Sequence, residues 1–260
     1  MFESIRELIS YRYMVKNLVK RDIRGRYKGS LLGFIWNFIT PLIQVLVYIM
    51  VFTSIYHTTL DNFAVYLVSG MAIWIWFSES LSEGSGTFIA NSELVKKIYF
   101  PRSVLPLSTV LSKMINFLIL LGIFFIIIMA TGHGFNYVAL LYLPIYIIIS
   151  FVFILGMVLI LSSLNVFARD IQYIVTVILM AWIWITPIMY SREMITDDLI
   201  NNLLGLNPLT YIVEGYQKIL YWKAAPDFFD LAISSLIAIV TFAVGILVFR
   251  RLEGSFAEVL

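Results

Sequence analysis

The sequence contains no cysteine and only two histidines, His57 and His133, which lie far apart along the chain. The absence of cysteine excludes disulfides, thiolate metal sites and lipidated thiols. Two distant histidines offer few ligands to a transition metal. We therefore expect this chain to hold no metal and no cofactor of its own.

Charged residues are also scarce, at 13% of the chain against 61% hydrophobic residues. Four long stretches contain no Asp, Glu, Lys or Arg, namely 29–60, 114–168, 171–191 and 231–249. Each matches or exceeds the roughly 20 apolar residues that cross a hydrocarbon core about 30 Å thick. This composition excludes an ordinary soluble domain and indicates a helical membrane protein.

Division of these stretches at polar residues and helix breakers predicts an all-α integral membrane protein. Its six spans are expected at 31–56, 63–80, 106–131, 137–163, 171–190 and 230–249. Most of the 18 Lys and Arg residues fall before the first span, in the second and fourth loops and after the last span. The positive-inside rule therefore places both termini in the cytoplasm. The net charge of +2 gives no indication of nucleic-acid binding.

The first 30 residues form a separate segment with its own pattern. Basic residues fill one helical face, and apolar residues recur on the other, namely Ile5, Leu8, Ile9, Val15, Leu18, Val19, Ile23 and Tyr27. The pattern predicts an amphipathic helix on the inner membrane surface. Two interpretations stay open: the helix only anchors the chain to anionic lipid, or it is a gate that recruits an anionic head group.

The loop at 83–106 is long for a link between two spans. Asn91 or Ser92 is placed to cap a short polar helix, which Pro101 and Pro106 would end. A short helix under a membrane bundle is a surface that a soluble partner can push. An ordinary solvated connector is the alternative interpretation.

The segment at 191–229 is too apolar for a free loop and too interrupted for another span. We expect two helical pieces in it. Thr196 is placed to cap the first piece, with Asp197 and Asp198 in the opening turn, where carboxylates complement the helix dipole.

Asn207 followed by Pro208 is a typical start for the second piece. Its apolar residues share one face, and Glu214 with Lys218 form an expected ion pair four residues apart on the other face. The pattern predicts two short re-entrant helices that dip into the outer leaflet before the last span.

Catalytic signatures are absent: the sequence has no phosphate loop, no H-E-x-x-H and no G-x-S-x-G. Within the predicted spans the clear ionisable candidate is Lys113, and we expect its long side chain to reach back to the cytoplasmic surface. Gradient coupling, which usually needs embedded ionisable residues, is therefore poorly supported. The energy for any work is expected to come from a partner.

Aromatic residues gather near the ends of the predicted spans, among them Trp36, Trp74, Trp76, Trp182, Trp184 and Tyr190. Interfacial belts are one explanation. The tryptophans also form two pairs spaced by two residues, so the members of each helical pair point in widely separated directions. One member of each pair is then free to face a central pathway, where an aromatic wall suits sliding sugars.

Four segments carry a resemblance to a known family. In order along the chain they are RGRYKGSLLGFIW at 24–36, LNVFARDI at 164–171, WITPIMY at 184–190 and LNPLTYIVEGY at 206–216. Together with Pro41 they resemble the permease subunit of ABC-2-type exporters of lipid-linked polysaccharides, the O-antigen and teichoic-acid transporters. These segments are distributed over most of the chain.

The resemblance implies a homodimer in the bacterial inner membrane, bound to two copies of a separate ATPase subunit that holds ATP and Mg²⁺. It implies that the ATPase moves a coupling helix that includes Ser92, Glu93, Lys96 and Lys97. The basic residues Arg24, Arg26 and Lys28 would then hold the substrate's pyrophosphate near the inner surface. The six aromatic residues named above would line the route.

The expected function is therefore that of a transporter, not of an enzyme: ATP-driven export of a polyprenyl-diphosphate-linked polysaccharide. An ABC-2 exporter of a drug or small lipid is the near alternative. A membrane enzyme that acts on polyprenyl-linked sugars would need a carboxylate or histidine cluster. Only Asp197 with Asp198, or Glu79 with Glu83, comes close to that requirement.

Overall fold

The computed structural model describes residues 10–25, 33–54 and 60–260, and every regular element in these ranges is a helix. The expected all-α class is confirmed. The α-helices are α2 (Arg12–Gly25), α3 (Trp36–Ser54), α4 (Phe63–Ser85), α5 (Thr87–Ala90), α6 (Ser92–Lys97), α7 (Val104–Thr131), α8 (Tyr137–Leu140), α9 (Leu143–Phe167), α10 (Ile171–Ile185), α11 (Asp198–Leu206), α12 (Pro208–Leu220), α13 (Phe228–Leu252) and α14 (Phe256–Val259). Short 3₁₀ turns lie at Gly33–Ile35, Arg192–Met194 and Glu253–Ser255.

Four apolar segments in the described ranges are long enough to cross a membrane: Phe63–Ser85, Val104–Met129, Tyr137–Phe167 and Phe228–Ser255. They coincide with four of the six expected spans. At the other two positions lie shorter apolar helices, Ile39–Ser54 and Ile171–Ile185.

The fifth expected span, 171–190, is longer than the helix that the structure has there. Helix α10 ends at Ile185, five residues before residue 190. Thr186 has an extended backbone, with φ of −103° and ψ of 131°. A residue that precedes a proline avoids the helical region, and Pro187 follows Thr186. Proline thus ends the helix at the edge of the apolar run.

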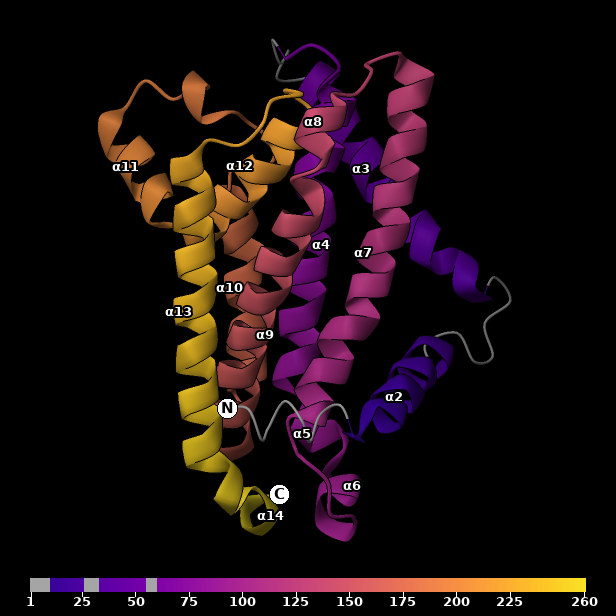
Figure 1. The fold of residues 1–260 in the computed structure, drawn as a ribbon, viewed down its shortest axis with the longest axis vertical. Helices are drawn as coiled ribbons and strands as arrows, with labels where there is room; N and C mark the ends of the chain where they lie inside the picture. Colours follow the sequence, from indigo (N-terminus) through magenta and orange to yellow (C-terminus); the bar gives the residue numbers. More distant parts are fainter. Residues whose placement is uncertain (1–9, 26–32, 55–59) are drawn as a thin grey trace.

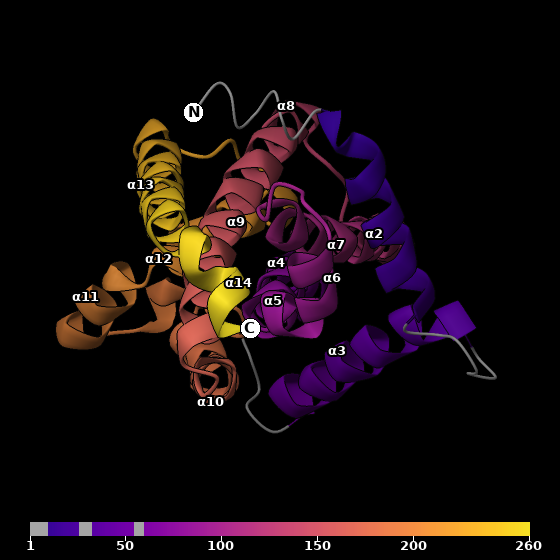
Figure 2. The ribbon, with the colours of Figure 1, turned by 90° about the horizontal axis from the view of Figure 1, so that it is seen from below.

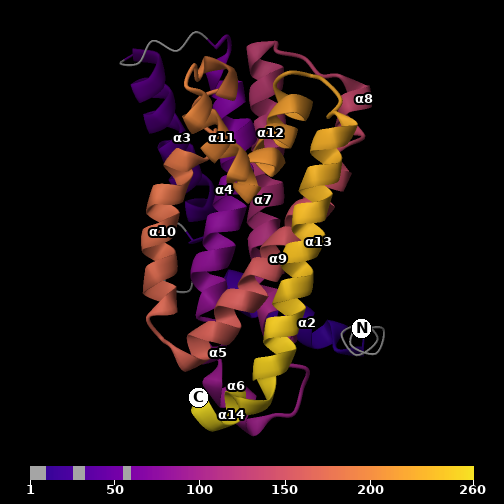
Figure 3. The ribbon, with the colours of Figure 1, turned by 90° about the vertical axis from the view of Figure 1, so that its left-hand side faces the viewer.

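The helices form an elongated bundle around α4 (Figure 1). Helix α4 packs on α3, α7, α9, α10 and α12, and most of its side chains are buried. Helices α9 and α13 run side by side, whereas α2 and α3 lie on the far side of α4 and α7 (Figure 2). Helices α11 and α12 lie at one end of the bundle between α10 and α13, and α6 and α14 lie at the opposite end (Figure 3).

Helices α9 and α13 approach closely where each helix carries a glycine, Gly156 in α9 and Gly245 in α13. A Cβ atom on Gly245 would lie 2.5 Å from the carbonyl oxygen of Gly156, and one on Gly156 would lie 2.7 Å from the Cα of Phe242. Small residues allow two membrane helices to bring their backbones together, where dispersion forces hold them. This contact fixes α13 to the bundle.

Helix α12 confirms the expected cap and apolar face. The Asn207 side chain accepts a hydrogen bond from the Leu209 amide at 3.1 Å. The predicted face is buried, namely Leu209, Ile212, Val213, Tyr216, Ile219 and Leu220. Gly215 lies so close to Tyr146 of α9 that a Cβ atom would meet the ring at 1.9 Å.

Two local predictions for the 191–229 segment were wrong. Asp197, not Thr196, caps α11, and its carboxylate accepts from the Leu199 amide at 2.8 Å. Glu214 forms an ion pair with Arg192 at 3.5 Å. Lys218 instead pairs with Asp227 and Asp230 at the start of α13. Neighbouring elements offered nearer partners than the same helix did.

We expect Gly245→Ala to lower the stability of the purified protein by about 1–3 kcal/mol, since the added methyl would overlap the α9 backbone. Thermal unfolding in detergent measures the effect. Gly122→Ala on α7 is the matched control, because a Cβ atom there meets nothing within 4 Å. The control should be neutral or slightly stabilising. Equal destabilisation by both variants would contradict the close contact.

Candidate functional site

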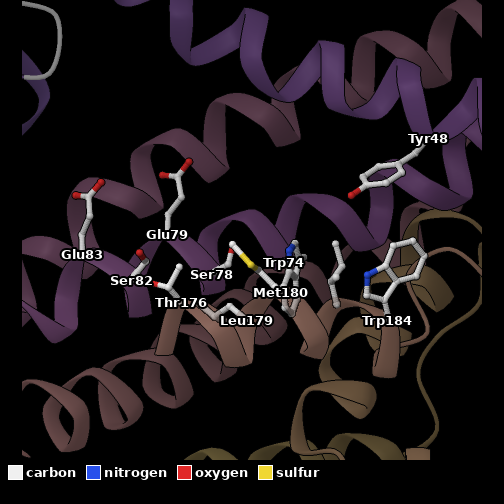
Figure 4. Close-up of a pocket in the computed structure, with 11 residues that line it drawn as sticks. Tyr48, Trp74, Ser78, Glu79, Ser82, Glu83, Thr176, Leu179, Met180 and Trp184 are labelled. Atoms are coloured by element: carbon white, nitrogen blue, oxygen red, sulfur yellow. The ribbon is translucent and has the colours of Figure 1, made fainter. Parts of the chain in front are cut away.

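A groove of about 490 Å³ lies between α3, α4 and α10 (Figure 4). Its lining combines aromatic, hydroxyl, carboxylate and aliphatic side chains, namely Tyr48, Trp74, Ser78, Glu79, Ser82, Glu83, Thr176, Leu179, Met180, Ile183 and Trp184. Helices from three separate parts of the sequence therefore build one surface. The mixture of rings, hydroxyls and carboxylates suits a sugar, which offers both apolar faces and hydroxyl groups.

The tryptophan pairs divide between the groove and the core. Trp184, which is 57% exposed, lines the groove, and Trp74, which is 5% exposed, reaches it only with a small part of its ring. Trp76 is buried between α4 and α7, where it stacks on Phe117 at 4.9 Å and donates to the carbonyl of Val110. The spacing of two residues thus separates the rings of a pair, as the 100° turn per residue requires.

The other expected aromatic residues are not among the residues that line the groove. Trp182 donates through Nε1 to Asn207 at 2.9 Å and so ties α10 to the cap of α12. The Tyr190 hydroxyl donates to the carbonyl of Trp184 at 3.0 Å, which holds the end of α10. Trp36 is exposed at the start of α3.

The polar lining of α4 was not identified from the sequence as part of a route. Ser78, Glu79, Ser82 and Glu83 are spaced by three and four residues and therefore share one face of the helix. Figure 4 shows Glu79 and Glu83 extending in the same direction from α4. The spacing of these four residues indicates a polar face on α4. The packing of α3 and α10 determines whether that face meets the groove, and the sequence does not show this packing.

Lys113 of α7 pairs with both carboxylates, and its side chain is completely buried. Its ammonium nitrogen lies 3.6 Å from Glu79 and makes a closer contact with Glu83. The expectation that this lysine reaches back to the cytoplasmic surface was wrong. A buried ammonium group needs counter-charges, and α4 supplies them within reach.

A chain of polar contacts joins α2 to the segment around α6. Arg21 donates to the Asn91 side chain at 2.5 Å, and Asn91 donates to the carbonyl of Thr87 at 2.8 Å. On the same side, Ser112 of α7 donates to the Asp22 carboxylate. Helix α2 is thus connected both to the start of α6 and to the α7 turn that carries Lys113.

Helix α6 carries the four residues expected in the coupling helix. Glu93 pairs with Lys97, and both are exposed, as is Lys96, whereas Val95 is buried. Asn91 occupies the capping position before Ser92, but its side chain makes no capping bond because Arg21 and Thr87 engage it. Tyr99, just after α6, is 97% exposed. The described loop therefore presents charge and one aromatic ring at the end of the bundle.

The structure describes one of the three basic residues that were expected at the gate. Arg24 lies exposed in the last turn of α2. Arg26 and Lys28 lie outside the described residues. Within the described ranges, no group of three or more His, Asp or Glu side chains is arranged to hold a metal ion.

At the other end of the bundle a smaller polar cavity lies between α11, α12 and α13. Burial raises the pKa of Glu214 there, and the nearby Arg192 guanidinium opposes that shift. Arg192 also donates to Asn201 of α11 at 2.9 Å. Through Arg192 these contacts hold α11 against α12. They give Arg192, Asn201 and Glu214 a structural role.

The family model described as ABC-2 type transporter matches residues 13–221, a range that includes every helix of the groove. The chain is 34% identical over 259 residues to the O-antigen export system permease protein RfbA of Myxococcus xanthus, with 99% of each chain covered. It is 29% identical over 206 residues to the protein of the same name from Klebsiella pneumoniae, with 79% of each chain covered. The resemblance noted in the sequence is thereby confirmed, and this chain belongs to the ABC-2 type transporter family.

Proposed function

We propose that this chain is the transmembrane subunit of an ATP-driven exporter of a polyprenyl-diphosphate-linked polysaccharide of the O-antigen type. The observation that carries the proposal is the similarity to an O-antigen export permease over 99% of both chains. A groove lined by rings, hydroxyls and carboxylates supports a carbohydrate as the transported molecule.

The proposed topology has six spans in the bacterial inner membrane, with both termini in the cytoplasm. Helix α10 alone covers about 22 Å at 1.5 Å per residue, so the residues after it complete the crossing. Helices α11 and α12, with 9 and 13 residues, are too short to span and serve as the re-entrant pair. Helix α2 lies on the inner surface, where its basic residues meet anionic lipid.

Two copies of the chain are proposed to close the groove into a pathway. The helices that border it, α3 and α10, expose apolar side chains beside the groove, including Ile43, Leu46, Val47, Met50, Tyr173, Ile174, Val177 and Ile178. A second copy would cover these faces and would contribute the same lining by symmetry. Trp74 and Trp184 would then lie on the route, with Trp36 and Tyr190 near its ends.

In the proposed cycle, two ATPase subunits bind ATP and Mg²⁺ and press on α6 through Ser92, Glu93, Lys96 and Lys97. Arg24, Arg26 and Lys28 hold the pyrophosphate at the entrance, where guanidinium groups offer paired donors to phosphate oxygens. The Arg21–Asn91 contact carries the movement of α6 to α2. Trp76 and Trp182 support the route from behind and do not touch the glycan.

Enzymatic chemistry on this chain is not part of the proposal. In each carboxylate pair that an enzyme would need, at least one member has another partner. Glu79 and Glu83 pair with Lys113, and Asp197 caps α11.

Purification of the chain from its native membrane in mild detergent tests the proposal. We expect a stoichiometric partner with a phosphate loop, identified by mass spectrometry, and a complex of two permeases with two ATPases by native mass. A chain that purifies alone would argue for gradient-driven transport or membrane enzymology instead.

Trp184→Ala should lower the rate of glycan export about three- to tenfold, because stacking on its exposed ring contributes roughly 0.5–1.5 kcal/mol. Trp74→Ala should lower the rate less, because only a small part of its ring reaches the groove. Surface glycan measured over time gives the rate, and co-purification of the ATPase shows that the complex still assembles. Trp222→Ala, outside the groove, is the control. Normal export by both groove variants would disprove the aromatic route.

Asn91→Ala and Arg21→Met should each reduce export several-fold while ATP hydrolysis continues, since one hydrogen bond to a charged group is worth about 1.5–3 kcal/mol. The double variant should be no worse than Asn91→Ala alone, because Asn91→Ala already removes the contact with Arg21 together with the bond to Thr87. Additive losses, or a parallel fall in ATP hydrolysis, would contradict a transmitting role for this pair.

A further inference from the structure

A second cavity, of about 510 Å³, lies at the end of the bundle that carries α6. Its walls come from the loop after α6, from the start of α7, and from α9 and α13. Figure 3 shows α9 and α13 running side by side toward this end. None of the described lining residues belongs to α3, α4 or α10, so the cavity is separate from the groove. Its volume lies within the roughly 300–1,000 Å³ of cavities that hold small ligands.

The part of the cavity that reaches farthest into the bundle is apolar. Leu155 and Leu159 of α9 line it, together with Phe242 and Ile246 of α13. Each pair is spaced by four residues and therefore shares one face of its helix. The close glycine contact between α9 and α13 lies beside these residues and brings the two apolar faces together. The cavity thus has an apolar floor at a helix crossing.

The apolar stripe on α13 ends at a guanidinium group. Arg250 follows Ile246 by four residues and lines the same cavity. Phe242 and Arg250 are eight residues apart, which corresponds to about 12 Å along the helix. The charge therefore lies toward the end of the bundle, and the apolar surface extends inward from it.

A second guanidinium lines the cavity from the loop before α7. The Arg102 guanidinium lies over the Phe256 ring, 5.9 Å from its centroid. A ring contact engages the face of a guanidinium and leaves its in-plane N–H groups able to donate. Glu253 is the carboxylate among the described lining residues, so two guanidiniums stand against one carboxylate. Arg250 and Glu253 each have a further contact inside the protein, but a guanidinium has five N–H donors and can also serve a phosphate.

A cavity with guanidiniums at one end and an apolar floor matches an anionic phospholipid. Guanidinium groups donate to phosphate oxygens, and an acyl chain gains by covering apolar surface. Free phosphate would leave the apolar floor uncovered. Helix α13 leaves most of its side chains exposed, so a lipid can approach the cavity from the side of the bundle.

We infer that this cavity binds one anionic phospholipid, with its head group between Arg102 and Arg250 and an acyl chain along Ile246 and Phe242. In the proposed orientation the site lies in the inner leaflet, which is rich in anionic lipid. The bound lipid is a resident of the complex and not its cargo, because the cavity shares no helix with the groove. Its phosphate joins the loop after α6 to the end of α13.

Native mass spectrometry of the full chain, with any partner that copurifies, tests the inference after detergent exchange has removed bound lipid. Titration with dioleoyl phosphatidylglycerol should give one tightly bound lipid per chain. Dioleoyl phosphatidylcholine should bind about tenfold more weakly, because its head group carries no net charge. Inorganic phosphate should not displace the bound lipid. Equal binding of the two lipids, or displacement by phosphate, would overturn the inference.

Two adjacent arginines provide a matched pair of variants. Arg250→Gln should weaken the binding of phosphatidylglycerol about tenfold, since it removes a charged donor from the cavity. Arg251→Gln removes the same charge one residue farther along, at an exposed position outside the lining, and should leave the affinity within about twofold of the wild type. Equal losses in both variants would indicate general surface attraction and would overturn a defined site.

A phosphatidylglycerol with a photoreactive group on its acyl chain locates the lipid. Peptide mapping should find the cross-links on α9 and α13, at Leu155, Leu159, Phe242 or Ile246. Cross-links confined to α3 and α10 would place the lipid in the groove and overturn the inference. A wild-type chain that binds no phosphatidylglycerol would also overturn it, because protein rather than lipid would then fill the cavity.

Discussion

The buried ammonium group of Lys113 is the interaction on which the arrangement of the groove depends. A charge without water must have opposite charges beside it, so α7 and α4 are held where Lys113 meets Glu79 and Glu83. This requirement fixes the rotation of α4 about its axis. With that rotation set, Trp74 faces the groove, whereas Trp76 faces α7.

The same turn of α7 connects the groove to the polar contacts between α2 and the segment around α6. Ser112, next to Lys113, donates to Asp22 of α2, and the neighbouring Arg21 reaches Asn91 at the start of α6. In the proposed cycle, a displacement of α6 would reach α2 and α7 through these contacts. Discrete polar contacts between rigid helices are suited to this, because each contact is either made or broken.

Features set by local geometry were predictable from the sequence. The cap at Asn207 depends on residues two positions apart, and the divergence of the tryptophan pairs depends only on helical pitch. The partners of Lys113 and Glu214 were not predictable, since they come from other helices. The face of α4 that meets the groove was hidden for the same reason. A helix buried on nearly all sides shows no amphipathic pattern.

The lining of the groove is also the physical basis for the proposed pairing of two chains. Its walls come from α3, α4 and α10, and the outer faces of α3 and α10 are apolar. Carboxylates and hydroxyls that face lipid would lose their hydrogen-bond partners, at a cost of several kcal/mol for each group. A polar groove flanked by apolar faces is stable in a bilayer when a second such surface covers it and water or a polar substrate fills the space between them. In the proposed pair of chains, the apolar faces would form the seal and the polar strip would form the path.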